Sequence, residues 1–339
     1  MGEQYRIKAV CIPLWLPHYW GSVGRLLAMP ETATKPKKQR RNTPKIVRRL
    51  LLTLAVLYFV PLIGLGIFQR FLVFNAPASR TRTAEYGTQA PRGAETIRLR
   101  TDAGDTVVAY FGHALRADGT PDTDYFKRPT LLFFTGKGSA IAPERGLFQS
   151  FRRLDLNVLM PDYVGFGQSG GTESETNCFL TARTSYTFLR AQPDLDQTQL
   201  VVAGYSLGSG VAIDLAAHEL SAKQPVAGLA VFAAYTGMAD MGHQEYPVYP
   251  SWLLRAILKY PFASDAKMPQ ITCPVLLVHS RADRLIPYAM SGKLTALCKG
   301  PVARVTITRA NHSEYFSARE TAVFPALKRF TERINHENH

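Results

Sequence analysis

Residues 201–208 read Val-Val-Ala-Gly-Tyr-Ser-Leu-Gly, and this stretch decides the fold. The apolar run Leu200–Ala203 predicts a short, fully buried strand. Residues 204–208 fit the pattern G-x-S-x-G, and the apolar positions that follow them are compatible with a helix. A strand, a glycine-flanked serine and a helix in this order are the context that a nucleophile elbow requires.

Steric crowding explains why this pattern has glycines at positions 204 and 208. The turn is so tight that side chains two residues on either side of the serine would collide, and the serine itself is strained. We therefore predict Ser206 as a nucleophile held above the sheet, with the Leu207 N–H pointing where an oxyanion forms. The pattern alone is a weak signal, because Gly and Ser are common, and an ordinary strand-to-helix turn is the alternative.

The chain has 339 residues, of which 46% are hydrophobic, so it can bury the core of one large domain. Its net charge is +14, but residues 1–49 alone carry 11 basic and 2 acidic side chains, a net charge of +9. A basic tail on a nearly neutral domain indicates a role at a membrane or in targeting. The remainder shows no basic stripe, so we expect no nucleic-acid partner.

The 19 residues Leu50–Phe68 carry no charge, and eight Lys and Arg residues precede them between Lys35 and Arg49. At the rise of an α-helix the uncharged stretch is about 28 Å long, close to the hydrocarbon thickness of a bilayer. We expect a basic tail at 1–49, a transmembrane segment at 50–68 and a connector at 69–92. A buried core helix is the alternative, although such a helix is rarely apolar all round.

The positive-inside rule predicts a single-pass protein with its N-terminus in the cytoplasm. Residues 70–339 would then lie on the far, periplasmic or extracytoplasmic side of the membrane. A cleaved signal peptide is the alternative, because Ala76-Pro77-Ala78 loosely resembles a cleavage site. The apolar core is long for a signal peptide, so we favour an uncleaved signal anchor. Met29 is an alternative start.

Strands and helices alternate after the connector, which predicts an α/β domain over residues 93–333. Residues 96–101 and 107–111 flank a polar turn and predict a hairpin. Short apolar runs then suit a mostly parallel central sheet with helices on both faces; they lie at 131–134, 158–160, 200–203, 229–233, 275–278 and 302–307. The stretch 236–270 predicts a short cap with one amphipathic helix.

A serine hydroxyl needs a base to take its proton and a carboxylate to orient that base. In this architecture the partners follow in the order Ser, Asp or Glu, His. His312 lies just past the last predicted strand, where a base belongs, and it is our candidate over the other three histidines that we weighed, His218, His243 and His279.

The candidate acid is Asp283, which lies in the loop after the predicted strand 275–278. Asp240 and Asp265 are the rivals, but both lie in the cap, where carboxylates more often cap helices or face solvent. The four cysteines show no metal-ligand spacing and allow one disulfide bridge or none.

On these residues the chain resembles α/β-hydrolase-fold serine hydrolases, and most of all their membrane-anchored branch with a small lid, which includes monoacylglycerol lipase-like and depalmitoylase-like enzymes. The resemblance covers about residues 70–330. The motifs that carry it are Phe71-Leu72-Val73-Phe74, Pro161-Asp162-Tyr163-Val164-Gly165-Phe166-Gly167-Gln168-Ser169, Gly204 to Gly208, Val278-His279-Ser280 to Asp283 with Pro287, and Asn311-His312. They are specific for the fold, less so for hydrolysis, and barely informative about the substrate.

Two departures from the family pattern stand out. The family usually has H-G-N after the third strand, where this chain has Thr135-Gly136-Lys137. The resemblance implies that the Lys137 backbone N–H is one oxyanion donor and the Leu207 N–H the other, while the loop lacks the histidine that normally shapes it. Lys137 either places a cation near the substrate or is simply solvated. Val164 stands where the family has an arginine that is more often structural than catalytic.

The sequence therefore predicts a membrane-anchored serine hydrolase that cleaves esters or thioesters, with Ser206, His312 and Asp283 as its triad. The expected substrate is a small-molecule or lipid acyl ester, and no metal or organic cofactor is implied. A non-catalytic scaffold on the same fold, or an acyltransferase or peptidase with the same triad, are the alternatives.

Overall fold

The computed structural model describes residues 44–317 and 322–337. Contacts divide the chain into two units, Met1–Leu54 and Ala55–His339. Within the first unit the described residues begin helix α1, Lys45–Val73. Most of the predicted basic tail, with Cys11 and Met29, lies outside the described residues.

The second unit contains an eight-stranded sheet in the order β1-β2-β4-β3-β5-β6-β7-β8. The hairpin β1–β2 and the pair β2–β4 are antiparallel, and every other pairing is parallel, so the predicted hairpin and the predicted mostly parallel sheet are both observed. The strands are β1 Glu95–Arg100, β2 Thr106–Gly112, β3 Thr130–Phe134, β4 Asn157–Pro161, β5 Leu200–Tyr205, β6 Gly228–Phe232, β7 Val275–Ser280 and β8 Val302–Ile307.

The register aligns the carboxyl ends of the parallel strands along one edge of the sheet. Phe134 of β3 pairs with Gly204 of β5, and Tyr205 of β5 pairs with Phe232 of β6. Farther along, Ser280 of β7 pairs with Ile307 of β8. The loops that follow β3, β5, β7 and β8 therefore meet at this edge, which is where ligands bind in open α/β sheets.

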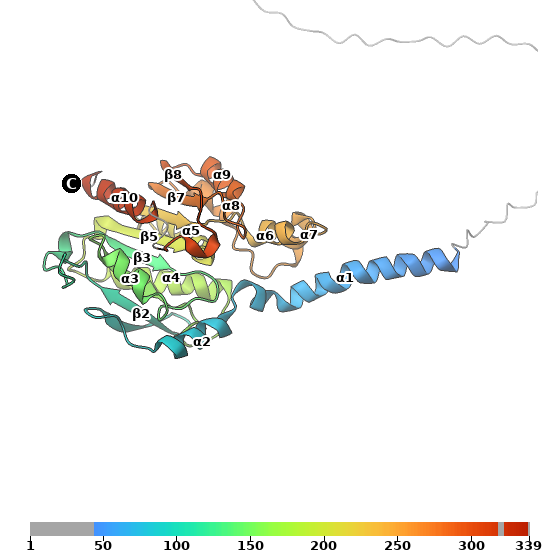
Figure 1. Ribbon diagram of the computed structural model, residues 1–339, viewed down its shortest axis with the longest axis horizontal. Helices are drawn as coiled ribbons and strands as arrows, with labels where there is room; N and C mark the ends of the chain where they lie inside the picture. The colour runs from blue at the N-terminus through green and yellow to red at the C-terminus, as the bar shows by residue number, and fades with distance from the viewer. Residues whose placement is uncertain (1–43, 318–321, 338–339) are drawn as a thin grey trace, which may run out of the picture. The chain divides into compact units, whose positions relative to one another are not determined.

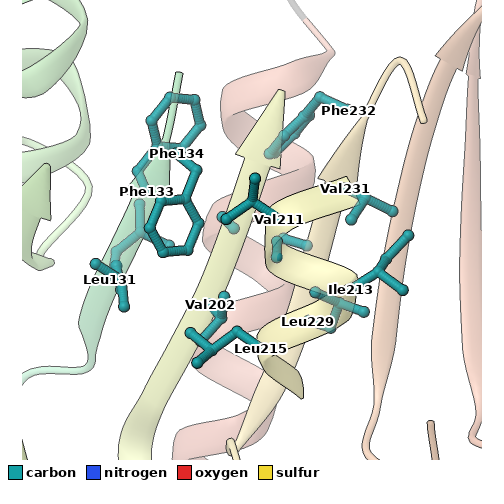
Figure 2. Packing of buried hydrophobic residues seen from close by; sticks show 14 of the residues in the cluster. Leu131, Phe133, Phe134, Val202, Val211, Ile213, Leu215, Leu229, Val231 and Phe232 are labelled. Atoms are coloured by element: carbon teal, nitrogen blue, oxygen red, sulfur yellow. The ribbon is translucent and has the colours of Figure 1, made fainter. Parts of the chain in front are cut away.

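Helices cover both faces of the sheet, and its central strands are therefore buried on both sides. Helix α5 (Leu207–Ser221) lies over β5 and β6 with Val211 and Leu215 among their side chains, and the faint red helix α10 (Val323–Glu337) passes behind them (Figure 2). Helix α4 (Glu175–Arg190) is joined to α5 by the Arg183–Asp214 ion pair. On the other face, Phe151 of α3 (Arg145–Arg152) packs edge-on against Phe324 of α10.

The segment expected as a connector is helical and packed in part. The last residues of α1 lead into α2, Ala76–Tyr86, through Phe74, which is fully buried against Tyr260 and Phe262. Of the four residues expected to pack here, Val73 and Phe74 are buried, whereas Phe71 and Leu72 are exposed. Figure 1 shows α1 in blue and α2 in blue-green, with α2 following the end of α1.

The cap, residues 236–270, contains two helices of similar length where the sequence predicted one. These are α6, Met238–Glu245, and α7, Ser251–Ile257, followed by the short helix α8, Ser264–Lys267. The cap packs against α1: Leu62 of α1 shares a small apolar cluster with Ala239, Tyr249 and Leu254.

Candidate active site

The predicted elbow joins β5 to α5, and Ser206 stands at the turn. Its backbone has φ 54° and ψ −120°, a strained conformation for a residue with a side chain. A Cβ on Gly204 would lie 2.0 Å from the Gly208 carbonyl oxygen, and a Cβ on Gly208 would lie 2.2 Å from that of Phe134. Only glycine fits at either position, so the steric prediction for the G-x-S-x-G turn is confirmed.

His312 and Asp283 lie beside the serine, although they are far from it in sequence. His312 Nε2 is 2.9 Å from Ser206 Oγ, and His312 Nδ1 is 2.9 Å from Asp283 Oδ2. A carboxylate only accepts hydrogen bonds, so Nδ1 carries the proton and Nε2 is free to accept one from the serine hydroxyl. The structure thus brings the three predicted residues together in a continuous chain of hydrogen bonds.

The Asp283 side chain is buried but well supplied with donors. Its Oδ1 accepts the backbone N–H groups of Leu285 and Ile286, each at 2.9 Å. Burial raises the pKa of this carboxyl, but the hydrogen bonds from His312 and the two backbone N–H groups outweigh it and lower the pKa below its ordinary value. Asp283 is therefore ionised at neutral pH and can stabilise a proton on His312.

Two tyrosines that the sequence analysis did not single out complete this arrangement. The Tyr315 hydroxyl donates to Asp283 Oδ2 at 3.1 Å and accepts the Ser280 backbone N–H at 2.8 Å. The Tyr205 ring stacks on the imidazole of His312, and its hydroxyl donates to the His312 carbonyl oxygen. Tyr205 lies inside the G-x-S-x-G motif, but no sequence pattern signals its partner 107 residues away.

The rival residues have other partners. His279 is fully buried, with Nε2 at 2.9 Å from the Ile286 carbonyl oxygen, and His243 Nδ1 is bonded to the carbonyl oxygen of Tyr249. His218 lies beside Glu219. The carboxylates of the two rival acids, Asp240 and Asp265, both pair with Arg255 in the cap.

The loop after β3 carries the predicted oxyanion donor Lys137 and is held from two sides. The Tyr163 hydroxyl donates to the Thr135 carbonyl oxygen at 2.9 Å, and the Gly138 N–H donates to the Phe74 carbonyl oxygen at 2.9 Å. These bonds fix the loop without the histidine that the family pattern usually has there. In the described part of the chain, neither the Lys137 N–H nor the Leu207 N–H donates to another residue, so both can serve a ligand.

A cavity of about 1140 Å³ opens in front of Ser206. It is lined by the loop 135–139, helix α3 with Glu144 before it, Arg82 of α2, the loops that carry Arg284 and His312, the cap and the last turns of α1. Lys137 is among the residues that line this cavity, and the partial burial of its side chain lowers the pKa of its ammonium group. Among residues 44–317 and 322–337 no group of three His, Cys, Asp or Glu side chains could hold a metal ion.

Comparison with known proteins identifies relatives whose sequences match most of the chain. A sequence model described as "alpha/beta hydrolase fold" matches residues 129–247. An uncharacterized protein of Mycobacterium tuberculosis is 26% identical over 283 residues, which cover 82% of this chain and 94% of the relative. Protein bem46 of Schizosaccharomyces pombe is 26% identical over 253 residues, 70% of this chain and 79% of the relative.

Solved structures resemble the chain at lower sequence identity. An α/β hydrolase from Vibrio vulnificus superposes with a TM-score of 0.58 and 18% identity over 79% of this chain and 92% of the other. The Pyrococcus furiosus esterase Pf2001 superposes with a TM-score of 0.55 and 16% identity over 73% of this chain and 99% of the other. With the strand order and the elbow described above, these matches establish that the chain has the α/β-hydrolase fold, as predicted.

Proposed function

We propose that the protein is a serine hydrolase that cleaves carboxylic esters or thioesters. The observation that carries the proposal is the hydrogen-bonded chain from Asp283 through His312 to Ser206, which ends in a cavity beside two backbone N–H groups that have no partner among the described residues. A serine, a base, an orienting carboxylate and oxyanion donors are the parts that acyl transfer requires. The fold likeness to esterase Pf2001 agrees with this chemistry.

The geometry implies an acyl-enzyme mechanism. Ser206 Oγ attacks the carbonyl carbon while His312 Nε2 takes its proton, and Asp283 stabilises the imidazolium that forms. The N–H groups of Lys137 and Leu207 bind the oxyanion. His312 then gives its proton to the leaving alcohol or thiol, and the acyl group remains on Ser206. A water molecule, deprotonated by His312 in turn, hydrolyses this ester and restores the serine.

We further propose that α1 anchors the enzyme in a membrane. Within the described residues, it is the helix that is long and apolar enough to cross a bilayer. The basic residues before Leu50 favour a cytoplasmic N-terminus, with the hydrolase domain on the periplasmic or extracytoplasmic side.

The serine assignment is tested by labelling membranes with a fluorophosphonate, which reacts with activated serines. The wild type should be labelled, and Ser206→Ala should lose labelling and several orders of magnitude of esterase activity while it still folds. Ser221→Ala is the matched control, because Ser221 lies at the far end of α5 and its hydroxyl donates to the His218 carbonyl oxygen.

Two outcomes would refute the proposal. Labelling that persists in Ser206→Ala would exclude this residue as the nucleophile, and folded wild type that resists labelling would support a non-catalytic scaffold. For a labelled enzyme, product analysis with and without an alcohol acceptor separates hydrolysis from acyl transfer, and peptide substrates test for peptidase activity.

A further inference from the structure

The apolar helix α1 supplies part of the wall of the cavity in front of Ser206. Leu65, Gly66, Gln69, Leu72 and Val73 line the cavity from this helix. On the side of the cap it is lined by the apolar side chains Met238, Met241, Leu254, Ile257 and Leu258, and also by the polar residues Gln244, Glu245 and Tyr246. Most of the lining side chains that α1 and the cap contribute are apolar, whereas the loops around Ser206 are mostly polar.

The position of α1 against the cap is fixed by specific contacts. Gln69 is buried, its Oε1 accepts the Lys259 backbone N–H at 2.6 Å, and its Nε2 donates to the Gly66 carbonyl oxygen at 2.7 Å. The Tyr249 hydroxyl donates to the Tyr58 carbonyl oxygen at 2.8 Å. A buried glutamine in an apolar helix needs such partners, so these bonds specify one arrangement of helix and cap.

The two faces of α1 have different environments. Tyr58, Leu62, Leu65, Gln69 and Val73 repeat every three or four residues and form the stripe that meets the domain. On the opposite face, Ile63, Ile67 and Phe68 are each about 60% exposed or more. The outer face suits lipid, and the inner face suits a chain bound in the cavity.

We propose that α1 is part of the substrate site and selects esters with a long acyl chain, an inference that rests on the proposed hydrolase function. The cavity is larger than the upper end of the range that holds a drug-sized ligand, about 1,000 Å³. A short acyl group would leave its apolar part empty. A long chain on Ser206 would lie between α1 and the cap, where each methylene gains by leaving water.

The helix offers a matched pair of variants to test this. Gly66 lines the cavity and Gly64 does not, yet a Cβ on either meets nothing within 4 Å and both have ordinary helical backbone. Gly66→Leu therefore narrows the cavity, and Gly64→Leu adds the same side chain outside it. The measurement is the rate of labelling of the full chain in membranes by two alkyl fluorophosphonates, one with an ethyl and one with a dodecyl chain.

We expect the wild type and Gly64→Leu to prefer the dodecyl probe, and we expect Gly66→Leu to lower the dodecyl-to-ethyl ratio of rates by about tenfold. Leu65→Trp should lower the ratio in the same way, with Ile63→Trp as its exposed control. An unchanged ratio in both cavity variants, or an equal fall in the controls, would overturn the inference. A wild type that neither probe labels would instead refute the hydrolase function itself.

Discussion

At the scale of single residues, the Asp283–His312 pair depends on tyrosine side chains that have no part in the chemistry. Tyr315 bonds at once to Asp283 Oδ2 and to the Ser280 N–H at the end of β7. Asp283 is thereby tied to the sheet from which its loop emerges. Tyr315 is a positioning residue, because it reaches the serine only through Asp283 and His312.

Tyr315→Phe should lower kcat about tenfold and leave KM nearly unchanged, because the carboxylate loses a hydrogen bond and its fixed orientation while the cavity keeps its shape. The measurement is steady-state kinetics with a short ester. Tyr186→Phe is the control: its buried hydroxyl bonds to carbonyl oxygens near Gln224, far from the site, so it should alter stability alone. A tenfold loss in both variants would mean that the effect of Tyr315 is purely structural.

The sequence could locate Ser206, Asp283 and His312 because each lies just after an apolar run, and such loops meet at one edge of a parallel sheet. Tyr315 could not be found in this way. It lies three residues after His312, and its role depends on the distance from β7, which no local pattern encodes.

At the scale of elements, the elbow joins β5 to α5 in a turn too tight for a side chain at Gly204 or Gly208. Gly208 in the first turn of α5 lies against the carbonyl oxygens of Phe134 and Thr135 at the end of β3. Three segments therefore meet around one glycine, and the strained backbone of Ser206 is held by all of them.

Gly208→Ala should destabilise the fold by several kcal/mol, because its Cβ would lie 2.2 Å from a backbone oxygen that cannot move alone. Thermal unfolding in detergent should show a fall in Tm of several degrees or a failure to accumulate folded protein. Gly146→Ala in α3 is the control, since a Cβ there meets nothing within 4 Å and the helix should be unharmed. Equal stability of the two variants would contradict the steric account.

The central strands were predictable because each is a short run that is apolar on both faces. The edge strand β8 was also predicted at its observed bounds, Val302–Ile307. Helix α6 was not predicted. Its residues, Met238–Glu245, lack a helical apolar period, and they are held by contacts made in the fold: the Thr236 hydroxyl donates to Asp240, and Leu254 of α7 packs on Ala239.

At the scale of the whole molecule, a partly buried carboxylate links the cap to the body of the domain. Glu175 in the first turn of α4 accepts the Phe262 backbone N–H, which lies in the cap between α7 and α8, at 3.0 Å. Burial raises the pKa of Glu175 to about 7, although Lys267 and the Phe262 N–H partly oppose it. Between about pH 4.5 and 7 the folded state therefore keeps a proton on Glu175 that the unfolded state, with a pKa near 4.5, has already released.

This difference should make the protein less stable as the pH rises from about 4.5 to 7. Glu175→Gln keeps an oxygen for the Phe262 N–H and removes the titration, so it should raise Tm by a few degrees at pH 8 and flatten the pH dependence. Tm measured from pH 5 to 8 provides the check, with the exposed Glu85→Gln as control. A Glu175→Gln profile parallel to that of the wild type would exclude Glu175 as the source.

The contacts that hold α1 against the domain have a consequence for the proposed membrane anchoring. Arg70 donates two hydrogen bonds to the Glu173 carboxylate, at 2.9 and 3.0 Å, and the Gln69 side chain is hydrogen-bonded to the cap. The end of α1 is therefore held against the domain by fixed contacts and not followed by a flexible linker. A hydrolase domain on a flexible linker can reorient freely above its membrane and can reach substrates in neighbouring surfaces. With α1 anchored in a membrane as proposed, these contacts would hold the domain in one orientation to the bilayer and favour substrates that diffuse laterally in it.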